Sequence, residues 1–306
     1  MKIGIPKALL YFKYANLWES FFDAMGIDYL VSPDTNKDIL ALGIRYAVDE
    51  SCLSSKIFLG HVAWLKNRCD AVFVPRIASY GKAGTVCTKF AAIYDVCANT
   101  FRSDALALMH YNIDLEKQEK ELGAFLKLGK LLGKKRAQSL FAYWSAKQTE
   151  RAAQRIAVQE QERVLAGDGI KILLVAHPYN IQDQYTGTPV VSALKEMGAE
   201  PVLACQTDSR QAVMASYTLS ETVPWLFSRE LLGAVNLIKG RVDGIILIST
   251  FPCGPDSLVN EIITRRVKDK PILNLILDGQ EGTAGLQTRL ESFLDIINFK
   301  RYSRIG

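Results

Sequence analysis

Three of the six cysteines in this 306-residue chain lie where a thiol would be presented rather than packed. Cys52 ends a polar run, Cys87 follows a loop rich in Gly, Ser and Lys, and Cys253 lies in the stretch Phe-Pro-Cys-Gly-Pro-Asp-Ser. Prolines fix φ and remove backbone donors, so Cys253 is expected on a stiff turn after the apolar run 244–250. Open α/β sheets place their ligands at that end of a strand. Three thiols from separate loops suit an iron-sulfur cluster, whose usual ligands are thiolates.

Other interpretations of the cysteines stay open at this point. The chain has no CxxC pair, and a single cysteine is often a small core residue, so spacing alone does not establish a metal site. Structural zinc is disfavoured because it takes four ligands, often in close pairs. Cys253 is also a candidate nucleophile, although no histidine lies near it in the sequence. The remaining cysteines are predicted to pack in the core: Cys69, Cys97 and Cys205.

Ionisable residues accompany Cys52 and Cys253. Glu50 lies two residues before Cys52 and is a candidate catalytic group that directs a proton, with capping of the turn as the alternative. Lys56 lies about one helical turn after Cys52, where its ammonium would offset the negative charge of bound thiolates or extend into solvent. Asp256 is expected to cap the helix after Cys253 rather than to take part in catalysis.

Further candidates lie near Cys87 and in the second half of the chain. Arg76 precedes Cys87 and Lys89 follows it, and both are candidate cofactor contacts, with solvent exposure as the alternative. His177 ends the apolar run 170–176, at an edge where ligands bind, and is a candidate for catalysis and substrate contact. His61 lies in an apolar helical pattern and is expected to be a core histidine.

The elements that would position these residues occur twice along the chain. Each half begins with an apolar strand, continues with a helix that ends at a glycine, and returns to a second strand. Each half then has an Arg-x-Asp sequence that leads into another strand, followed by a loop that carries Cys87 or Cys253. Right-handed crossovers put the carboxyl ends of such strands at one edge of a parallel sheet. The matching segments are 2–6 with 170–176, 29–31 with 202–205, and 68–74 with 241–247.

This repeat predicts an α/β fold with two similar Rossmann-like (flavodoxin-like) parallel-sheet domains facing a cleft. We place the N-terminal α/β domain at 1–112 and the C-terminal α/β domain at 168–306. The segment 113–167 has no proline and is rich in Glu, Lys, Gln, Ala and Leu. It is predicted to form a helical arm or linker, broken near 129–133.

Composition argues against several classes of function. The chain is 49% hydrophobic and 23% charged, and its net charge of +5 is spread along the sequence, so nucleic-acid binding is not expected. No apolar run approaches the ~20 residues of a membrane span, and the chain opens with a strand rather than a signal peptide. We therefore expect a cytoplasmic protein whose cysteines serve metal binding, catalysis or packing instead of disulfides.

Several motifs resemble one known family. They are Ile-Gly-Ile-Pro-Lys-Ala-Leu-Leu-Tyr at 3–11, Asp-Glu-Ser-Cys at 49–52, Cys-Thr-Lys-Phe at 87–90 and Phe-Pro-Cys-Gly-Pro-Asp-Ser at 251–257. Together they resemble proteins related to the 2-hydroxyacyl-CoA dehydratases and their activators, over most of the chain except the helical arm. The resemblance implies two Rossmann-like domains that hold a [4Fe-4S] cluster through three cysteines, here Cys52, Cys87 and Cys253. Some relatives hold a larger, sulfide-bridged double-cubane cluster instead.

The same resemblance implies electron transfer in anaerobic metabolism. In that superfamily a separate ATP-dependent activator or reductase delivers low-potential electrons. This chain has no GxxxxGK[ST] loop, so it is expected to receive electrons rather than to hydrolyse ATP. A homodimer and a small-molecule or acyl-CoA substrate are further expectations.

The function predicted from the sequence is therefore an iron-sulfur protein that passes electrons to a substrate at an open-site cluster. Whether the chain is itself an enzyme, as a reductase or dehydratase-type component, stays open. The alternative is a cluster-free, two-domain ligand-binding or scaffold protein of the same fold.

Overall fold

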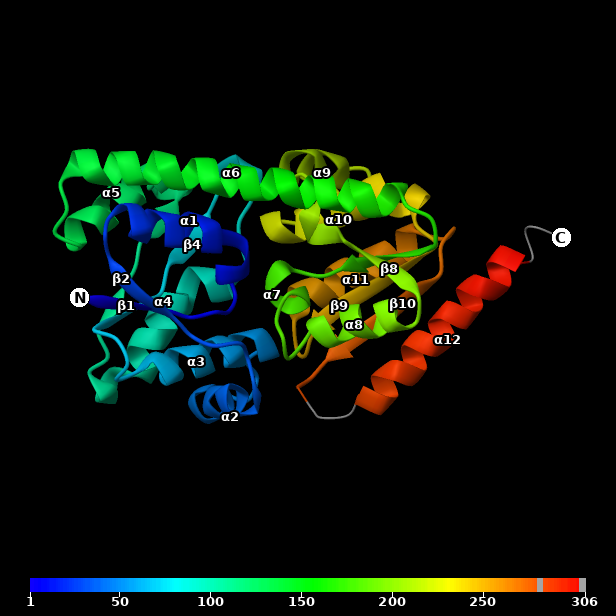
Figure 1. The fold of residues 1–306 in the computed structure, drawn as a ribbon, viewed down its shortest axis with the longest axis horizontal. Helices are drawn as coiled ribbons and strands as arrows, with labels where there is room; N and C mark the ends of the chain where they lie inside the picture. Colours follow the sequence, from blue (N-terminus) through cyan, green and yellow to red (C-terminus); the bar gives the residue numbers. More distant parts are fainter. Residues whose placement is uncertain (280–282, 303–306) are drawn as a thin grey trace. The chain divides into compact units, whose positions relative to one another are not determined.

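The computed structural model describes residues 1–279 and 283–302. The chain divides into two compact units, one of residues 1–155 with 224–226 and the other of 156–223 with 227–306. The boundary falls inside the long helix α6 (Arg136–Ala166), which Figure 1 shows as one continuous element. Each unit has its own four-stranded parallel sheet flanked by helices. The predicted class of two Rossmann-like parallel-sheet domains is therefore confirmed.

The first unit alternates strands and helices, as a parallel sheet requires. It also contains the short 3-10 turns η1 (Gly81–Ala83), η2 (Arg102–Asp104) and η3 (Leu115–Lys117). Its strands are β1 (Lys2–Ile5), β2 (Asp28–Val31), β3 (Ala71–Phe73), β4 (Arg76–Ser79), β5 (Leu108–Met109) and β6 (Asn112–Asp114). Its helices are α1 (Tyr11–Ala24), α2 (Lys37–Tyr46), α3 (Leu53–Leu65), α4 (Thr88–Thr100) and α5 (Glu121–Leu131).

The main sheet of the first unit has the strand order β2-β1-β3-β5, while β4 and β6 form a separate parallel pair. The helical spacing of α1 turns Trp18 and Phe22 toward the sheet. Both rings meet Phe73 of β3 edge to face, with ring centroids 5.1 and 5.4 Å apart. This aromatic packing fixes α1 against the strand that leads toward the Cys87 loop.

Helices α2 and α3 approach each other so closely at two points that each point requires a glycine. A Cβ atom on Gly43 would lie 2.0 Å from the carbonyl oxygen of Lys56, and one on Gly60 would lie 2.0 Å from that of Ile39. No side chain fits such a gap between backbones. The two glycines therefore fix the position of α3, the helix that begins directly after Cys52.

The second unit repeats the alternation of strands and helices. It also contains the 3-10 turns η4 (Ala204–Gln206) and η5 (Lys239–Arg241). Its strands are β7 (Ile170–Val175), β8 (Ala199–Leu203), β9 (Gly244–Thr250) and β10 (Ile272–Leu277). Its helices are α7 (Pro178–Ile181), α8 (Thr188–Glu196), α9 (Ser209–Ser216), α10 (Leu226–Ile238), α11 (Gly254–Arg266) and α12 (Thr283–Tyr302).

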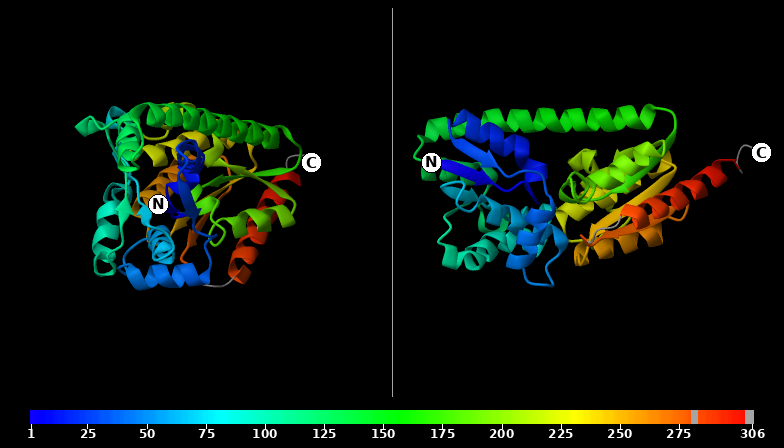
Figure 2. Two further views of the ribbon diagram at one scale, coloured as in Figure 1. Left: turned by 60° about the vertical axis from the view of Figure 1, so that its left-hand side comes forward. Right: turned by 60° about the horizontal axis from the view of Figure 1, so that its bottom comes forward.

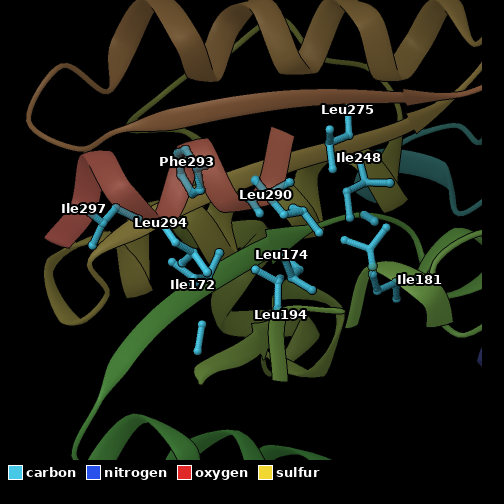
Figure 3. Packing of buried hydrophobic residues seen from close by; sticks show 14 residues of the cluster. Ile172, Leu174, Ile181, Leu194, Ile248, Leu275, Leu290, Phe293, Leu294 and Ile297 are labelled. Atoms are coloured by element: carbon cyan, nitrogen blue, oxygen red, sulfur yellow. The ribbon is translucent and has the colours of Figure 1, made fainter. Parts of the chain in front are cut away.

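The sheet of the second unit has the order β10-β9-β7-β8, and all neighbouring pairs are parallel. One face packs against α8 and α12 in the apolar cluster of Figure 3, where Leu174 and Ile248 of the sheet lie near Leu194 and Leu290 of the helices. Every residue of β9 is buried, so this strand is covered on both faces. A central strand that is buried in this way gives a fixed base to the turn that follows it.

The sequence repeat corresponds to a structural repeat. Read from one edge, both sheets follow the same order, because β2, β1, β3 and β5 match β8, β7, β9 and β10. The Arg-x-Asp sequences also match in detail. The Asp70 carboxylate accepts the backbone N–H of Lys2 at 2.6 Å, and the Asp243 carboxylate accepts that of Lys171 at 2.8 Å. In both units this aspartate connects the starts of two neighbouring strands.

The segment between the two sheets is mainly helical. The chain leaves α5 and enters α6 through Gly133, whose φ of +70° is a left-handed conformation that favours glycine. Figure 2 shows α6 running straight and unbroken in both views. Among the helices described, none has the length and apolar character needed to cross a membrane.

Candidate functional site

The three cysteines predicted as metal ligands share one structural position, the residue immediately before a helix. Cys52 precedes α3, Cys87 precedes α4 and Cys253 precedes α11. All three side chains are half-buried, and none accepts a capping hydrogen bond from its helix. The amino end of a helix carries partial positive charge and unpaired N–H groups. Each position therefore favours a negatively charged ligand atom such as a thiolate.

Hydrogen bonds at the start of α3 fix the Cys52 turn. The backbone N–H groups of Ser55 and Lys56 donate to the Cys52 carbonyl at 2.9 and 3.1 Å. The Cys52 Sγ lies 3.2 Å from the Ser55 Oγ. Lys56 donates its Nζ to the carbonyl of Asp49 at 2.9 Å, so its ammonium stays beside the turn that presents Cys52. Glu50 is exposed on the same turn.

The Cys87 turn is held by a distant part of the chain. Thr85 donates its backbone N–H to Pro224 at 3.1 Å and accepts the N–H of Leu226 at 2.8 Å. Gly84 allows this approach, because its φ is +132° and a Cβ there would lie 2.9 Å from the Pro224 oxygen. The short segment 224–226 thus braces the loop two residues before Cys87.

Arg76 and Lys89, the predicted cofactor contacts, have different surroundings. The Arg76 Nε donates to the carbonyl of Ala91 in α4 at 2.6 Å, and its Nη1 donates to Asn112 Oδ1 at 2.5 Å. Both acceptors are neutral. Through the bond to Ala91, Arg76 holds β4 against α4, the helix that follows Cys87. Lys89 is half-buried in the first turn of that helix. Of these two basic residues, Lys89 is nearer to Cys87 in the sequence.

The Cys253 turn follows the buried strand β9 and is fixed on both sides. The Cys253 N–H donates to the carbonyl of Thr250 at 2.8 Å. On the helical side, the Ser257 Oγ and N–H donate to the Cys253 carbonyl at 2.7 and 3.1 Å. Pro255 lies within the first turn of α11, where its missing N–H costs no helical hydrogen bond.

A buried pair connects the Cys253 helix to the neighbouring strand. His177 follows β7 and places its Nε2 2.9 Å from the Oδ1 of Asp256, in the first turn of α11. The two side chains are only 5% and 7% exposed. The ring of Tyr179 stacks on the imidazole with centroids 5.0 Å apart and planes at 15°. The Asp256 Oδ2 is buried and has no hydrogen-bond partner in the described part of the chain.

The expected capping role of Asp256 is wrong. Its carboxylate faces His177 and accepts no hydrogen bond from the start of α11 within the described residues. Nothing local in the sequence marks this pair, because 79 residues separate its members. The available signal is indirect: His177 follows one strand and Asp256 follows another, and the strand order makes these two strands neighbours.

Of the other three cysteines, Cys97 is buried, as predicted, and Cys69 and Cys205 are half-buried. The Cys69 Sγ lies 3.4 Å from the Leu65 carbonyl, and burial raises the pKa of its thiol. Cys97 is fully buried within α4, and burial raises its pKa to about 12. Cys205 packs against the apolar cluster of the second unit. A thiol with a raised pKa resists forming the thiolate that metals require, so Cys69 and Cys97 are poor candidates for metal ligands.

The predicted site residues are divided between the units. Cys52, Cys87 and their four ionisable neighbours belong to the first unit, and Cys253 and His177 belong to the second. Among the residues that the structure describes, no three His, Cys, Asp or Glu side chains are grouped as a metal site.

Fold and site together define an α/β protein of two Rossmann-like parallel-sheet units, with a cysteine at the start of three of its helices. Comparison with family models is more specific. Residues 2–205 match the family described as CoA enzyme activase uncharacterised domain, and the chain belongs to this family. The match includes Cys52, Cys87 and His177 and ends before Cys253.

Two further comparisons add no functional information. No curated protein matches the chain. Among solved structures, the SBP FpvC from Pseudomonas aeruginosa in complex with Mn2+ is similar over 99% of both chains, at 11% identity and a TM-score of 0.28. A similarity of that size carries no argument about this chain.

Proposed function

We propose that this chain is the iron-sulfur component of a system related to the 2-hydroxyacyl-CoA dehydratases. It accepts low-potential electrons from an ATP-driven reductase and passes them to a substrate. Membership of the CoA enzyme activase family supports the relation to this system and the need for a partner enzyme component. The cysteines support the iron-sulfur assignment.

The observation that carries the proposal is the position of Cys52, Cys87 and Cys253, each immediately before a helix. Cys52, Cys87 and Cys253 are half-buried at helix starts, whereas Cys97 is fully buried with a raised pKa. Thiolates ligate iron-sulfur clusters, and a helix start favours the thiolate. Three thiolates are the donor set that a [4Fe-4S] cluster with three protein ligands would need. Such a cluster supplies single-electron transfer and leaves one iron open to a further ligand.

The charges at the first two helix starts support the same assignment. Acidic residues are usually favoured in the first turn of a helix, yet α3 and α4 have none there. No acidic side chain in the first turn therefore competes with the cysteine thiolate for the positive end of either helix dipole. Lys56 and Lys89 add positive charge near Cys52 and Cys87 and would offset the negative charge of a thiolate-bound cluster. The exposed Glu50 is the proposed group for directing a proton at this end.

Anaerobic purification tests the proposal most simply. We expect a brown protein with about four iron atoms and about four acid-labile sulfides per chain, the content of one [4Fe-4S] cluster. A higher content would indicate the larger double-cubane cluster. A colourless, iron-free protein from iron-supplied anaerobic cells would contradict the proposal and favour a cluster-free scaffold.

A further inference from the structure

An apolar pocket lies in the first unit, where two neighbouring strands end. Pro6 directly follows β1 and Pro75 comes shortly after β3, and both line the pocket. The two strands pair in parallel within the sheet order β2-β1-β3-β5. The chain passes from β1 to β2 on one side and returns to β3 on the other, so the strand order reverses at this edge. Open α/β sheets bind their ligands at such a switch point.

The walls of this pocket are aromatic and aliphatic side chains from the helices and strands around it. Trp18 of α1, Phe58 of α3 and Phe90 of α4 line it from three helices, and Phe73 of β3 lines it from the sheet. Among the described residues that line the pocket, none is charged. The one polar side-chain atom, Nε1 of Trp18, donates to the Tyr111 hydroxyl at 3.0 Å. The pocket therefore offers a ligand packing surface but no side-chain hydrogen bond.

The loop from β1 to α1 lacks the groups that a phosphate site needs. In nucleotide-binding folds of this class the loop is rich in glycine, and backbone N–H groups face the phosphates. Here it reads Pro-Lys-Ala-Leu-Leu, and Pro6 has no N–H. The N–H of Lys7 donates to the Ser32 Oγ at 2.8 Å, and its ammonium pairs with Asp34 at 2.5 Å. The N–H of Ala8 donates to the Pro6 carbonyl at 2.9 Å. These donors are thus used within the protein.

Leu9 in the same loop has a strained backbone. Its φ is +49°, in the left-handed region that a residue with a large side chain rarely adopts. Glycine would favour this conformation, yet the chain has a leucine there, whose buried side chain lines the pocket. Backbone strain of this kind persists only where the surrounding structure fixes it, and it is concentrated at ligand sites. The loop is therefore built to present an apolar side chain at the switch point.

We propose that the switch point of the first unit binds a short, uncharged alkyl group of a small molecule, in place of the phosphate that such an edge often holds. The pocket has a volume of about 270 Å³, including the part that opens to solvent. Pockets for drug-sized ligands measure about 300 to 1,000 Å³, so this one holds the end of a molecule rather than a whole nucleotide. The inference goes beyond the proposed function and needs no cluster, because packing within one unit forms the pocket.

Xenon is the first probe of this site, because it is uncharged and binds in apolar cavities. The full-length chain, labelled with ¹³C at its isoleucine methyl groups, is titrated with xenon and followed by NMR. The methyl signals of Ile93, which lines the pocket, should shift and reach saturation. Those of Ile263, which is fully buried in the second unit, should stay in place. The absence of a saturable shift at Ile93 would overturn the proposal.

Substitution of Ala8, another residue that lines the pocket, tests the site by filling it. Ala8→Leu should weaken xenon binding by about tenfold or more, because the added carbons occupy the space of the ligand. Ala8→Val adds less volume and should have a smaller effect in the same direction, and it replaces Ala8→Leu if that variant does not fold. Ala137→Leu makes the larger change at an exposed position of α6 and is the matched control. Undiminished binding in the folded Ala8 variants would overturn the proposal.

Competition then tests the chemistry of the ligand. Isobutanol has a short alkyl group and should displace xenon, which returns the Ile93 signals toward their free positions. Inorganic phosphate and AMP should leave the xenon-bound signals unchanged. Displacement by either phosphate compound, or a failure of isobutanol to displace xenon, would overturn the assignment of an alkyl site. Iron content enters none of these measurements, so failure of this proposal is distinct from failure of the iron-sulfur proposal.

Discussion

The two units share a strand order but hold their cysteine-bearing helices by different means. In the first unit, α3 is held by backbone contact with α2 at Gly43 and Gly60. In the second unit, α11 is connected to the end of β7 by the buried pair of His177 and Asp256. The buried histidine of the first unit, His61, is satisfied by hydroxyls and stays neutral.

This difference is one between backbone packing and a polar side-chain contact. A contact between two backbones has one geometry and no protonation state of its own. The first unit therefore holds the helix after Cys52 by close packing, and the second unit holds the helix after Cys253 by a buried side-chain hydrogen bond.

The largest expected effect concerns His61 and pH. Its folded pKa of about 3 lies below the ordinary value of 6.5, so the unfolded state binds the proton more tightly. The stabilisation is complete above pH 6.5 and is lost as pH falls toward 3. Each pKa unit is worth about 1.4 kcal/mol, so the loss between pH 6.5 and 4.5 is about 3 kcal/mol.

Tryptophan fluorescence can measure this loss, because all four tryptophans lie in the first unit. The free energy of unfolding should fall more steeply with acid in the wild type than in His61→Asn. Equal slopes would show that His61 is not the neutral residue described here.

The next effect concerns the contact between α2 and α3. Gly43→Ala would place a Cβ 2.0 Å from a backbone oxygen and should force the helices apart, at a cost of about 2 kcal/mol. Gly123→Ala in α5 is the control, because a Cβ there would meet no neighbouring atom within 4 Å and alanine favours a helix. Denaturant unfolding followed by tryptophan fluorescence should show destabilisation only for Gly43→Ala. Similar effects of the two substitutions would contradict the close contact.

The smallest effect compares the matching aspartates. Asp70 and Asp243 accept equivalent backbone hydrogen bonds, but the first bond is exposed and the second is partly buried. A hydrogen bond that is shielded from water contributes about 1 kcal/mol, and an exposed one contributes less. Hydrogen exchange should therefore show a larger loss of protection at Lys171 in Asp243→Ala than at Lys2 in Asp70→Ala. The reverse order would contradict the expectation that the partly buried hydrogen bond of Asp243 contributes more than the exposed one of Asp70.

Periodicity and the Arg-x-Asp repeats predicted the parts of the fold that depend on local sequence: both sheets and the presence of helices after the cysteines, although not the residues at which those helices start. The strand expected over 69–76 and ending in Pro75 is shorter in the structure: β3 stops at Phe73, and a second strand, β4, begins after the proline, which lacks the N–H that a continuous ladder needs. The brace between Thr85 and the segment 224–226 was missed, since pairing between distant segments leaves no periodic signal. The pair of His177 and Asp256 was missed for the same reason.

The central claim, that cysteines at helix starts are the ligands, is tested most directly by iron content in matched cysteine variants. Cys253→Ala removes a half-buried thiol from a helix start, and Cys205→Ala removes a half-buried thiol that packs on the core of the same unit. After anaerobic purification, Cys205→Ala should keep the iron and sulfide content of the wild type, and Cys253→Ala should lose most of both. Wild-type iron content in Cys253→Ala would contradict the account.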